Sequence, residues 1–460
     1  MRSLIDHAHI LDAGLAAIRE QYTLPTEFPA HVLAAAEVAV RREPTEHVDR
    51  TDWPFVTLDP ASSTDLDQAF AITRSGNDLL LHYAIADVGW FVQPGDAIDT
   101  EAWQRGTTMY LPDGKTSLYP PVLSEGAASL LPDGPRPAVV FHVRVSDDGA
   151  TTLDGAERSL VRSRAKLAYD TVTAAELPAD FDELARRVHA GELARGAGRI
   201  DPPEQVVERT EHGYELQFRP RLPSEDHNAA MSLAANMAVA QAMLQAGTGL
   251  FRVMAAPDER AVRRLRNTAR AFGLQWPTDL TLDQFARTLD GAQPAQGAFM
   301  LAVRRAGGGA DYVPYEAGVT PWHAAMAATY AHATAPLRRL ADRYVVEATL
   351  AIANGVAVPA TIAGSFAPVA DVMNKADTVG SRLEREVVEL AEAVVLRDRI
   401  GHTFDAVVID DDPDSTTVAI AEVAVIAKVH ARGVIPGDEL RVKVAGVDID
   451  RRKVELQRVS

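Results

Sequence analysis

The stretch PFVTLDPASSTDLDQAFAITR, residues 54–74, joins two apolar segments through a short acidic loop. Both segments, PFVTLD and AFAITR, are short runs with aromatic and β-branched side chains, which is typical of strands. The loop between them is rich in Pro, Ser and Thr, and it brings Asp59, Asp65 and Asp67 close together in the sequence. The stretch therefore predicts a β-rich core with three carboxylates gathered at the end of a strand.

The spacing of the three aspartates predicts that they converge. Side chains of an extended chain alternate between its two faces, so Asp65 and Asp67 point the same way if residues 65–67 are extended. The loop is long enough to fold Asp59 back toward them. Such close carboxylates repel one another, and Mg²⁺ relieves the repulsion because it prefers oxygen ligands. Two such ions about 4 Å apart promote phosphodiester hydrolysis. The alternative is a polar turn whose Asp side chains bond backbone amides.

The rest of the chain predicts an α+β fold. Strand-like runs such as LLLHYAIADV (79–88) extend the β-rich region to about residue 165, and residues 165–399 show mainly helical patterns. Strands followed by many helices favour an α+β body. The last 60 residues return to short strand-like runs between Asp, Pro and Gly turns, a length that suits one OB-type barrel.

From these patterns we predict three domains, with limits at residues 1–48, 49–400 and 401–460. The first domain has helical patterns at about 4–20 and 29–43. This segment has two interpretations. It is either a helix-turn-helix-like module or a lid packed on the next domain.

Composition limits the class of function. The chain has 460 residues, no cysteine and a formal net charge of −18. Without Cys there are no disulfides, thiolate metal sites or Cys nucleophile, which suits a reducing cytoplasm. The negative charge argues against a protein that coats nucleic acid with a broad basic surface, but not against an enzyme that draws a strand into a basic channel. We expect a cytoplasmic protein, because the first residues are too polar for a signal peptide and the longest uncharged stretch, 228–251, suits a packed internal helix.

Four motifs in a fixed order resemble the catalytic domain of RNase II-type (RNB) exoribonucleases. They are DP-x4-DLDQA (59–69), LHYAIADVGWFVQPGDAID (81–99), YLPDG (110–114) and YAHATAPLRRLADR (330–343). The resemblance covers about residues 50–400. It implies the RNB fold, a β-sheet core surrounded by helices, followed by an RNA-binding OB-type barrel. The residues before it are too few for the cold-shock-type barrels that the family commonly carries, so we expect a shortened architecture.

The resemblance implies a hydrolytic 3′→5′ exoribonuclease that degrades single-stranded RNA to 5′-mononucleotides and a short oligonucleotide. It implies Mg²⁺ as the cofactor, with Mn²⁺ as a substitute. We expect a monomer that associates with no membrane and no obligate protein partner. Two other functions stay open: a catalytically silenced RNA-binding adaptor of the same fold, and a metal-dependent phosphodiesterase that acts on small nucleotides.

By this resemblance, Asp59, Asp65 and Asp67 are the catalytic acids that hold the metal and orient the attacking water. Gln68 stands where family members commonly have a fourth acid. Its carbonyl oxygen can ligate Mg²⁺ but brings no charge, which implies weaker metal binding or an unfilled second metal position. Arg338 is implied to clamp the scissile phosphate and to stabilise charge in the transition state. The alternative for this arginine is a solvated surface position.

The resemblance also implies a set of RNA-binding residues. Tyr110 stacks near the terminal base, which suits binding without sequence preference. Arg339 contacts a neighbouring phosphate or supports the arginine before it. His332 and Thr334 belong to the same motif, and Glu384 resembles a late acidic residue near the active site. Structural interpretations remain for three of them: a buried strand tyrosine for Tyr110, a core hydrogen bond for His332 and a solvated helix face for Glu384.

Overall fold

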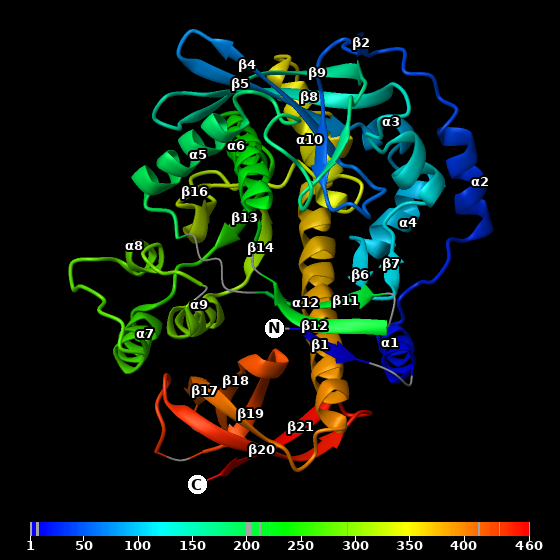
Figure 1. Ribbon diagram of the computed structural model, residues 1–460. Coiled ribbons are helices and arrows are strands. Elements are labelled where there is room, and N and C mark those ends of the chain that lie inside the picture. Colours follow the sequence, from blue (N-terminus) through cyan, green and yellow to red (C-terminus); the bar gives the residue numbers. More distant parts are fainter. Residues whose placement is uncertain are drawn as a thin grey trace.

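A computed structural model shows how the chain is arranged, and Figure 1 presents an α+β body, a C-terminal barrel and one long helix, α12 (Phe366–Arg397), that runs from the body to the barrel. The α+β class predicted from the sequence is confirmed. The structure describes residues 2–5, 9–198, 204–210, 213–219, 221–291, 293–412, 415–431 and 433–459.

A five-stranded sheet forms the centre of the body, in the order β2-β9-β8-β5-β4. Its pairs are antiparallel, except that β2 runs parallel to β9. The central strands β5 and β8 are buried along most of their length, which explains their nearly continuous apolar sequence. Because β4 begins directly after the acidic loop, the sheet fixes the position of that loop. The strands are β2 (Val48–Asp49), β4 (Gln68–Ser75), β5 (Asp78–Ala86), β8 (Arg136–Val145) and β9 (Thr151–Val161).

Helices cover the lower face of this sheet as Figure 1 is drawn. Helices α6 and α10 pack on β9, and α5 packs on α6 and β8. Helix α6 is rich in Ala and buried on most sides, so the packed internal helix predicted for 228–251 is confirmed over most of that stretch. Across the described ranges, no helix is long and apolar enough to cross a membrane. The helices of the body are α3 (Val88–Phe91), α4 (Ala97–Arg105), α5 (Phe181–Arg195), α6 (Pro223–Gln245), α10 (Leu340–Ala353) and α11 (Ala360–Ala363).

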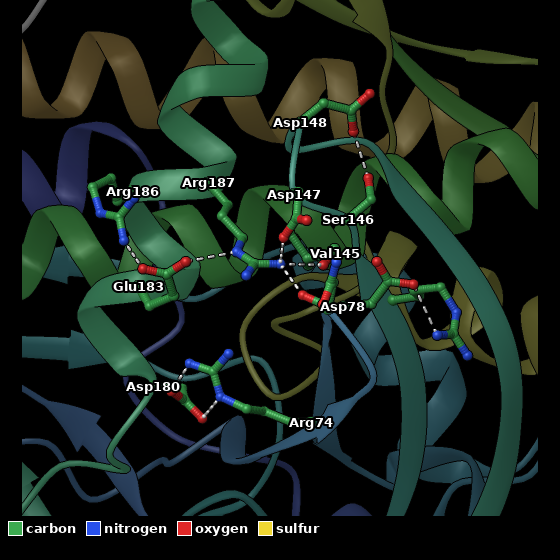
Figure 2. Close-up of polar contacts among 12 residues, drawn as sticks. Arg74, Asp78, Val145, Ser146, Asp147, Asp148, Asp180, Glu183, Arg186 and Arg187 are labelled. Carbon is green, nitrogen blue, oxygen red and sulfur yellow. Dashed lines mark hydrogen bonds and ion pairs between the residues drawn. The ribbon is translucent and has the colours of Figure 1, made fainter.

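Ion pairs fasten α5 to the end of the sheet that lies away from the acidic loop (Figure 2). Arg74, near the end of β4, pairs with Asp180 just before α5. Arg187 on α5 lies 2.9 Å from Asp147 in the β8–β9 turn, and it donates to the carbonyl oxygen of Asn77 in the β4–β5 turn at 2.7 Å. One helix therefore ties two hairpin turns together.

The prediction that residues 165–399 are mainly helical is only partly correct, because short strands interrupt the helices. Strands β11 and β12 form an antiparallel sheet with β1, and a second sheet has the order β14-β13-β15-β16. EQVVERT and GYELQFR, the sequences of β11 and β12, alternate with the period of a strand, a signal that the surrounding helical patterns obscured. The strands are β1 (Arg2–Ile5), β10 (Lys166–Ala168), β11 (Glu204–Thr210), β12 (Gly213–Arg219), β13 (Leu250–Met254), β14 (Ala310–Pro314), β15 (Trp322–His323) and β16 (Ala328–Thr329).

The N-terminal helices pack on different parts of the body. Residues 4 and 5, which were expected to be helical, belong to β1, and residues 6–8 lie outside the described part of the chain. Helix α1 (Ile10–Gln21) packs on α12, whereas α2 (Ala30–Ala39) packs on α4, and the two lie apart in Figure 1. This arrangement is that of helices packed on the next domain, not of a helix-turn-helix module. The domain limits themselves stay predictions.

The C-terminal strands close a barrel in the order β17-β18-β19-β21-β20, as the sequence predicted. Helix α12 packs on β20 and β21, and α9 packs on β17. Ile409 of the barrel is buried in the apolar cluster of α7, α8 and α9. The barrel therefore packs both on α12 and on this group of three helices. The elements are α7 (Glu259–Ala271), α8 (Leu282–Ala286), α9 (Pro294–Ala306), β17 (Thr403–Asp412), β18 (Ser415–Ile420), β19 (Val425–His430), β20 (Glu439–Asp448) and β21 (Lys453–Val459).

Candidate active site

The acidic loop is held by a strand at each end and by a buried leucine, Leu66, shortly before β4. Asp59 is the last residue of β3 (Thr57–Asp59), which pairs in parallel with β10. Leu66 is fully buried in the main core. Asp65 and Asp67 flank this leucine and contact other segments, which agrees with the alternation expected of an extended chain.

Asp67 meets the segment that precedes α10. Its Oδ1 accepts a hydrogen bond from the Leu337 amide at 2.7 Å, and its Oδ2 lies 3.2 Å from Arg338 Nε. Asp67 is buried, whereas 46% of the Arg338 side chain is exposed. The guanidinium therefore keeps exposed surface after it has paired with Asp67. Two motifs that are far apart in the sequence form one site.

Asp67, which is buried, and Asp59, which is partly buried, lack enough positive charge around their carboxylates. Burial raises the pKa of Asp67 to about 7, although Arg338 opposes the shift. The pKa of Asp59 also rises to about 7, first because of burial and then because of repulsion by Asp67. Asp59 Oδ2 is buried and has no hydrogen-bond partner among the described residues. An added cation would relieve both the repulsion and the unpaired oxygen.

A hairpin of β6 (Met109–Leu111) and β7 (Gly114–Thr116) holds Asp65 from another side. The Tyr110 hydroxyl donates to Asp65 Oδ2 at 3.2 Å, and Lys115 Nζ lies 2.9 Å from Asp65 Oδ1. Tyr110 is 54% exposed, so it is not the buried tyrosine of the structural interpretation. Its ring is available for stacking.

Gln68 is engaged within the body. It is buried at the start of β4, and its Oε1 accepts a hydrogen bond from the Tyr83 hydroxyl at 2.6 Å. An oxygen that already accepts from Tyr83 is a poorer metal ligand than a free one. The expectation that Gln68 ligates the metal gains no support from this geometry.

Arg339 supports the loop that carries its neighbour. Its guanidinium makes a forked contact with Asp342, at 2.9 Å to Oδ2 and 2.7 Å to Oδ1. Asp342 Oδ1 also accepts from the Ala335 amide at 2.7 Å, which fixes the turn before α10. The attraction of Asp342 helps to raise the pKa of Arg339 above its ordinary value, against the effect of burial. Of its two expected roles, supporting Arg338 fits this structure, and contact with a phosphate stays a prediction.

His332 and Thr334 serve the interior. His332 is partly buried between Tyr312 and Tyr330, and its Nδ1 lies 2.7 Å from the Tyr312 hydroxyl. Burial holds the pKa of His332 well below its ordinary value, so the ring is neutral and offers phosphate no charge. Thr334 is buried, and its Oγ1 lies 2.9 Å from Ser232 Oγ. These contacts favour packing roles, and the RNA contacts expected for the two residues stay predictions.

A cavity of about 640 Å³ opens beside the acidic loop. Arg338 and Gln68 reach it from the site, and Tyr169 and Asn228 line it where the Asn228 amide donates to the Tyr169 hydroxyl at 2.7 Å. Basic side chains outnumber acidic ones in its lining, which suits a phosphate strand despite the negative charge of the chain. The charged lining residues are Arg219, Arg221, Arg304 and Arg338, with Glu225 and Asp283.

Glu384 has a solvent-exposed position. It is exposed on α12 and lines a second cavity of about 650 Å³, which Tyr110 and Arg252 also line. Tyr110 contacts Asp65, so this cavity adjoins the acidic loop. The position of Glu384 suits the solvated helix face of the structural interpretation.

The donor set of the acidic loop suits a hard cation, although the ligands are not assembled around one point. Asp59, Asp65 and Asp67 offer carboxylate oxygens, and the bare Oδ2 of Asp59 lacks any proton donor within the described ranges. Among all the residues that the structure describes, no three His, Cys, Asp or Glu side chains form a group that could hold a metal ion. The reason is that Asp65 and Asp67 face cations of the protein itself, Lys115 and Arg338. The residues fit Mg²⁺ in their chemistry, and binding requires side chains to change partners.

Sequence reasoning missed Lys115, Tyr169 and Asn228. Lys115 directly follows the YLPDG motif, and a basic residue next to a motif with a stacking tyrosine was a usable signal. Tyr169 directly follows β10, beside Asp59, and its amide donates to the Asp59 carbonyl oxygen at 3.2 Å. Nothing in the local sequence of Tyr169 marks it, because the parallel pairing of β3 with β10 is not visible there.

Comparison with known families identifies the body and the barrel. The RNB domain matches residues 47–353, which is more than half of the chain. The chain belongs to the RNB family. The RNase II-type exonuclease C-terminal S1 domain matches residues 402–459, the segment of the barrel. The resemblance and the fold implied by the four motifs are thereby confirmed.

The curated relatives of this RNB protein are ribonucleases of greater length. Ribonuclease R of Aquifex aeolicus is 26% identical over 424 residues, covering 86% of this chain and 60% of the relative. Ribonuclease R of Escherichia coli is 24% identical, covering 98% of this chain and 62% of the relative. Exoribonuclease 2 of Proteus mirabilis is 31% identical over 52% of this chain and 40% of its own length. The chain thus spans about three-fifths of these two ribonuclease R sequences.

Solved structures share the fold of this RNB protein. The apo form of Mycoplasma genitalium RNase R superposes with a TM-score of 0.85 at 21% identity, covering 98% of this chain and 78% of that one. Yeast Ssd1, described as a pseudonuclease, superposes with a TM-score of 0.70 at 16% identity, covering 94% of this chain and 57% of that one. At these identities the likeness establishes the fold alone.

Proposed function

We propose that this RNB protein is a hydrolytic 3′→5′ exoribonuclease that degrades single-stranded RNA to 5′-mononucleotides and a short oligonucleotide. The observation that carries the proposal is the meeting of Asp59, Asp67 and Arg338 beside a cavity rich in arginine. Relatives named ribonuclease R and exoribonuclease 2 support it. A reducing cytoplasm suits a chain without cysteine, and we place the activity there.

The aspartates and the arginine have different roles in the proposed reaction. Asp59 and Asp67 would hold Mg²⁺, or Mn²⁺ in its place, and the bound ion supplies Lewis-acid stabilisation of phosphodiester hydrolysis. Arg338 is oriented by the contact of its Nε with Asp67, so its remaining donors are set to bind the scissile phosphate. This fixed cation would stabilise the charge that develops on the phosphate oxygens.

Tyr110 would place the RNA end relative to the acids. Its exposed ring suits stacking on a base, and its hydroxyl is anchored on Asp65. The Arg338 carbonyl oxygen accepts from the Thr108 amide at 2.9 Å, so the strand that carries the ring and the loop that carries the arginine are joined. Stacking and phosphate binding are therefore held at a fixed distance from each other.

Single-stranded RNA is the substrate that this arrangement suits. A stacked ring and arginine contacts to phosphate bind a strand without reading its sequence. Mycoplasma genitalium RNase R, which shares the fold, has been solved in complex with ribose-methylated single-stranded RNA and with double-stranded RNA. A free strand end fits our proposal because Arg338 of the site reaches into the cavity beside the acidic loop.

One alternative has an observation of its own. Gln68 replaces an acid and is occupied by Tyr83, and the described residues hold no ready group of three metal ligands. These features would suit a silenced RNA-binding adaptor, and the fold is shared with a pseudonuclease. The intact Asp59, Asp67 and Arg338 favour the enzyme.

Digestion of a 5′-labelled single-stranded RNA with Mg²⁺ tests the proposal. We expect a ladder that shrinks from the 3′ end, disappears in EDTA and is lost in Asp67→Asn. This variant is a fair test because an Asn oxygen can still accept from the Leu337 amide. RNA that is bound but not shortened by the wild type would indicate the adaptor. Faster cleavage of dinucleotides than of long RNA would indicate a phosphodiesterase of small nucleotides.

A further inference from the structure

Lys115 joins the β6–β7 hairpin to the acidic loop. In the register of the hairpin it lies directly across from Tyr110, and residues paired in this way project from the same face. Both reach Asp65, Tyr110 at Oδ2 and Lys115 at Oδ1. Lys115 Nζ also lies 3.0 Å from Glu125 Oε1. The ammonium is thus held between two carboxylates, with 21% of the lysine side chain exposed.

The three aspartates differ in the cation that each one has. Asp67 is paired with Arg338, and Asp65 is paired with Lys115. Among the residues that the structure describes, no side chain forms an ion pair with Asp59, whose buried Oδ2 is bare. The need for an added cation is therefore concentrated at Asp59. A second divalent ion at Asp65 would have to displace an ammonium that two carboxylates hold, and would leave that ammonium unpaired in a partly buried place.

The formal charge of the site also favours one added divalent ion over two. The carboxylates of Asp59, Asp65, Asp67 and Glu125, with the two cations that pair with three of them, carry a formal charge of −2, which one divalent ion neutralises. Gln68 follows Asp67 directly and adds no charge to this count, and its oxygen is occupied by Tyr83. A site for two divalent ions would carry an excess of positive charge until substrate arrived.

We propose that the Lys115 ammonium takes the place that a second divalent ion would fill, so that the site binds one divalent ion, at Asp59. Lys115 is then a positioning residue, which acts through Asp65 and fixes the number of ions. The inference rests on the metal-assisted hydrolysis proposed above. It concerns the stoichiometry of the site, which is measurable without RNA.

Titration of the metal-free protein with Mn²⁺, followed by electron paramagnetic resonance, tests this inference. We expect the wild type to bind one Mn²⁺ per chain in its tight class. Lys115→Met frees Asp65 and Glu125, so we expect two ions per chain, whereas Lys115→Arg keeps the charge and should keep one. Lys375→Met, which removes an exposed lysine on α12, controls for the general attraction of Mn²⁺ to a more acidic chain. Adding Asp65→Asn to Lys115→Met should return the count to one.

The outcomes separate this inference from the proposed function. Two ions on the wild type, with RNA still digested, would overturn the role of Lys115 and leave the exonuclease intact. One ion on a folded Lys115→Met variant would also overturn it. No tight ion on the wild type would overturn both proposals together, and one ion with no digestion of RNA would overturn the exonuclease alone.

Discussion

The acidic loop and the end of β5 each hold an aspartate with buried carboxylate oxygens, but the two carboxylates differ in the partners around them. Asp87, directly after β5, has a partner for each oxygen: Oδ1 accepts from the Trp90 amide at 3.1 Å, and Oδ2 lies 2.9 Å from Arg158 Nε and 3.0 Å from His47 Nε2. Asp59 has a buried oxygen with no partner in the described part of the chain. Both groups lie in motifs that resemble the family, so the motifs do not distinguish them.

The difference teaches how to separate structural from functional acids in this fold. A buried carboxylate whose oxygens are all paired stabilises the fold and has no capacity for a ligand. A buried carboxylate that lacks a cation costs stability and persists where a ligand compensates for it. By this criterion Asp87 is structural, and Asp59 belongs to the site. Each prediction below changes one side of this comparison.

The largest effect is expected at Asp59. Asp59→Asn removes the charge that the cation needs, so we expect RNA digestion to fall on the order of 10³-fold, the size of effect that follows loss of one group that stabilises transition-state charge. The rate is measured with 5′-labelled RNA at saturating Mg²⁺. Asp87→Asn is the matched control and should retain its rate per folded molecule. Equal losses in the two variants would contradict the distinction between them.

Substitutions of the two adjacent arginines should show the same contrast between a site residue and a structural residue. Arg338→Ala removes the half-exposed guanidinium, and we expect a loss on the order of 10²-fold in rate with little change in stability. Arg339→Ala leaves Asp342 buried without its forked partner, and we expect about 3 kcal/mol of lost stability. Urea unfolding and RNA digestion of both variants give the comparison. A stable Arg339→Ala protein with an unchanged loop would show that Asp342 does not need it.

Much of the distinction between site residues and structural residues could be predicted from the sequence. The strands around residues 54–88 and the closed barrel follow from local alternation and turns, and the three aspartates and Arg338 follow from their motifs. Which of two neighbouring arginines faces the cavity was harder, because it depends on Asp342, which binds Arg339 from one turn further along the chain. That pairing is a local pattern, so a closer reading of residues 338–342 would have found it.

Other features depend on segments that only the fold brings together. Lys115 is on the β6–β7 hairpin and contacts Asp65 of the acidic loop, and no local sequence pattern predicts that contact. For His332, an RNA contact and a core hydrogen bond were both open from the sequence, and only the fold shows that Tyr312 supplies such a hydrogen bond. The alternating strands 204–219 were missed since they lie between two strongly helical segments. Long-range contacts and short strands inside helical regions therefore limit such predictions.

A smaller effect is expected when the structural acid is changed. Asp87→Asn keeps the acceptor for the Trp90 amide but removes the charge that Arg158 and His47 face. Breaking one side of a buried ion pair is destabilising, and we expect about 2 kcal/mol of lost stability because the isostere preserves one hydrogen bond. Urea unfolding at pH 7 measures the loss. A variant as stable as the wild type would show that the pairs around Asp87 contribute nothing net.

The smallest expected effect is on the pH dependence of stability, and its sign is opposite to the usual one for an aspartate. The pKa of Asp59 is raised to about 7 from its ordinary value of 3.8. Between these two values the folded protein binds more protons than the unfolded one, so this group lowers stability as pH rises toward 7 and keeps it lowered above 7. Asp59→Asn removes the penalty. We therefore expect the metal-free variant to be about 1 kcal/mol more stable than the wild type at pH 8 and no more stable at pH 4.

Urea unfolding in EDTA across this pH range measures the difference, and Mg²⁺ supplies the control. If the cation compensates Asp59, added Mg²⁺ should stabilise the wild type at pH 8 and leave Asp59→Asn much less affected. At pH 5, where the proton occupies the carboxyl group, the stabilisation by Mg²⁺ should shrink. A wild type whose metal-free stability rises steadily from pH 4 to pH 8, relative to Asp59→Asn, would show that Asp59 is compensated by the protein itself. It would then resemble Asp87, and the contrast between the two acids would not hold.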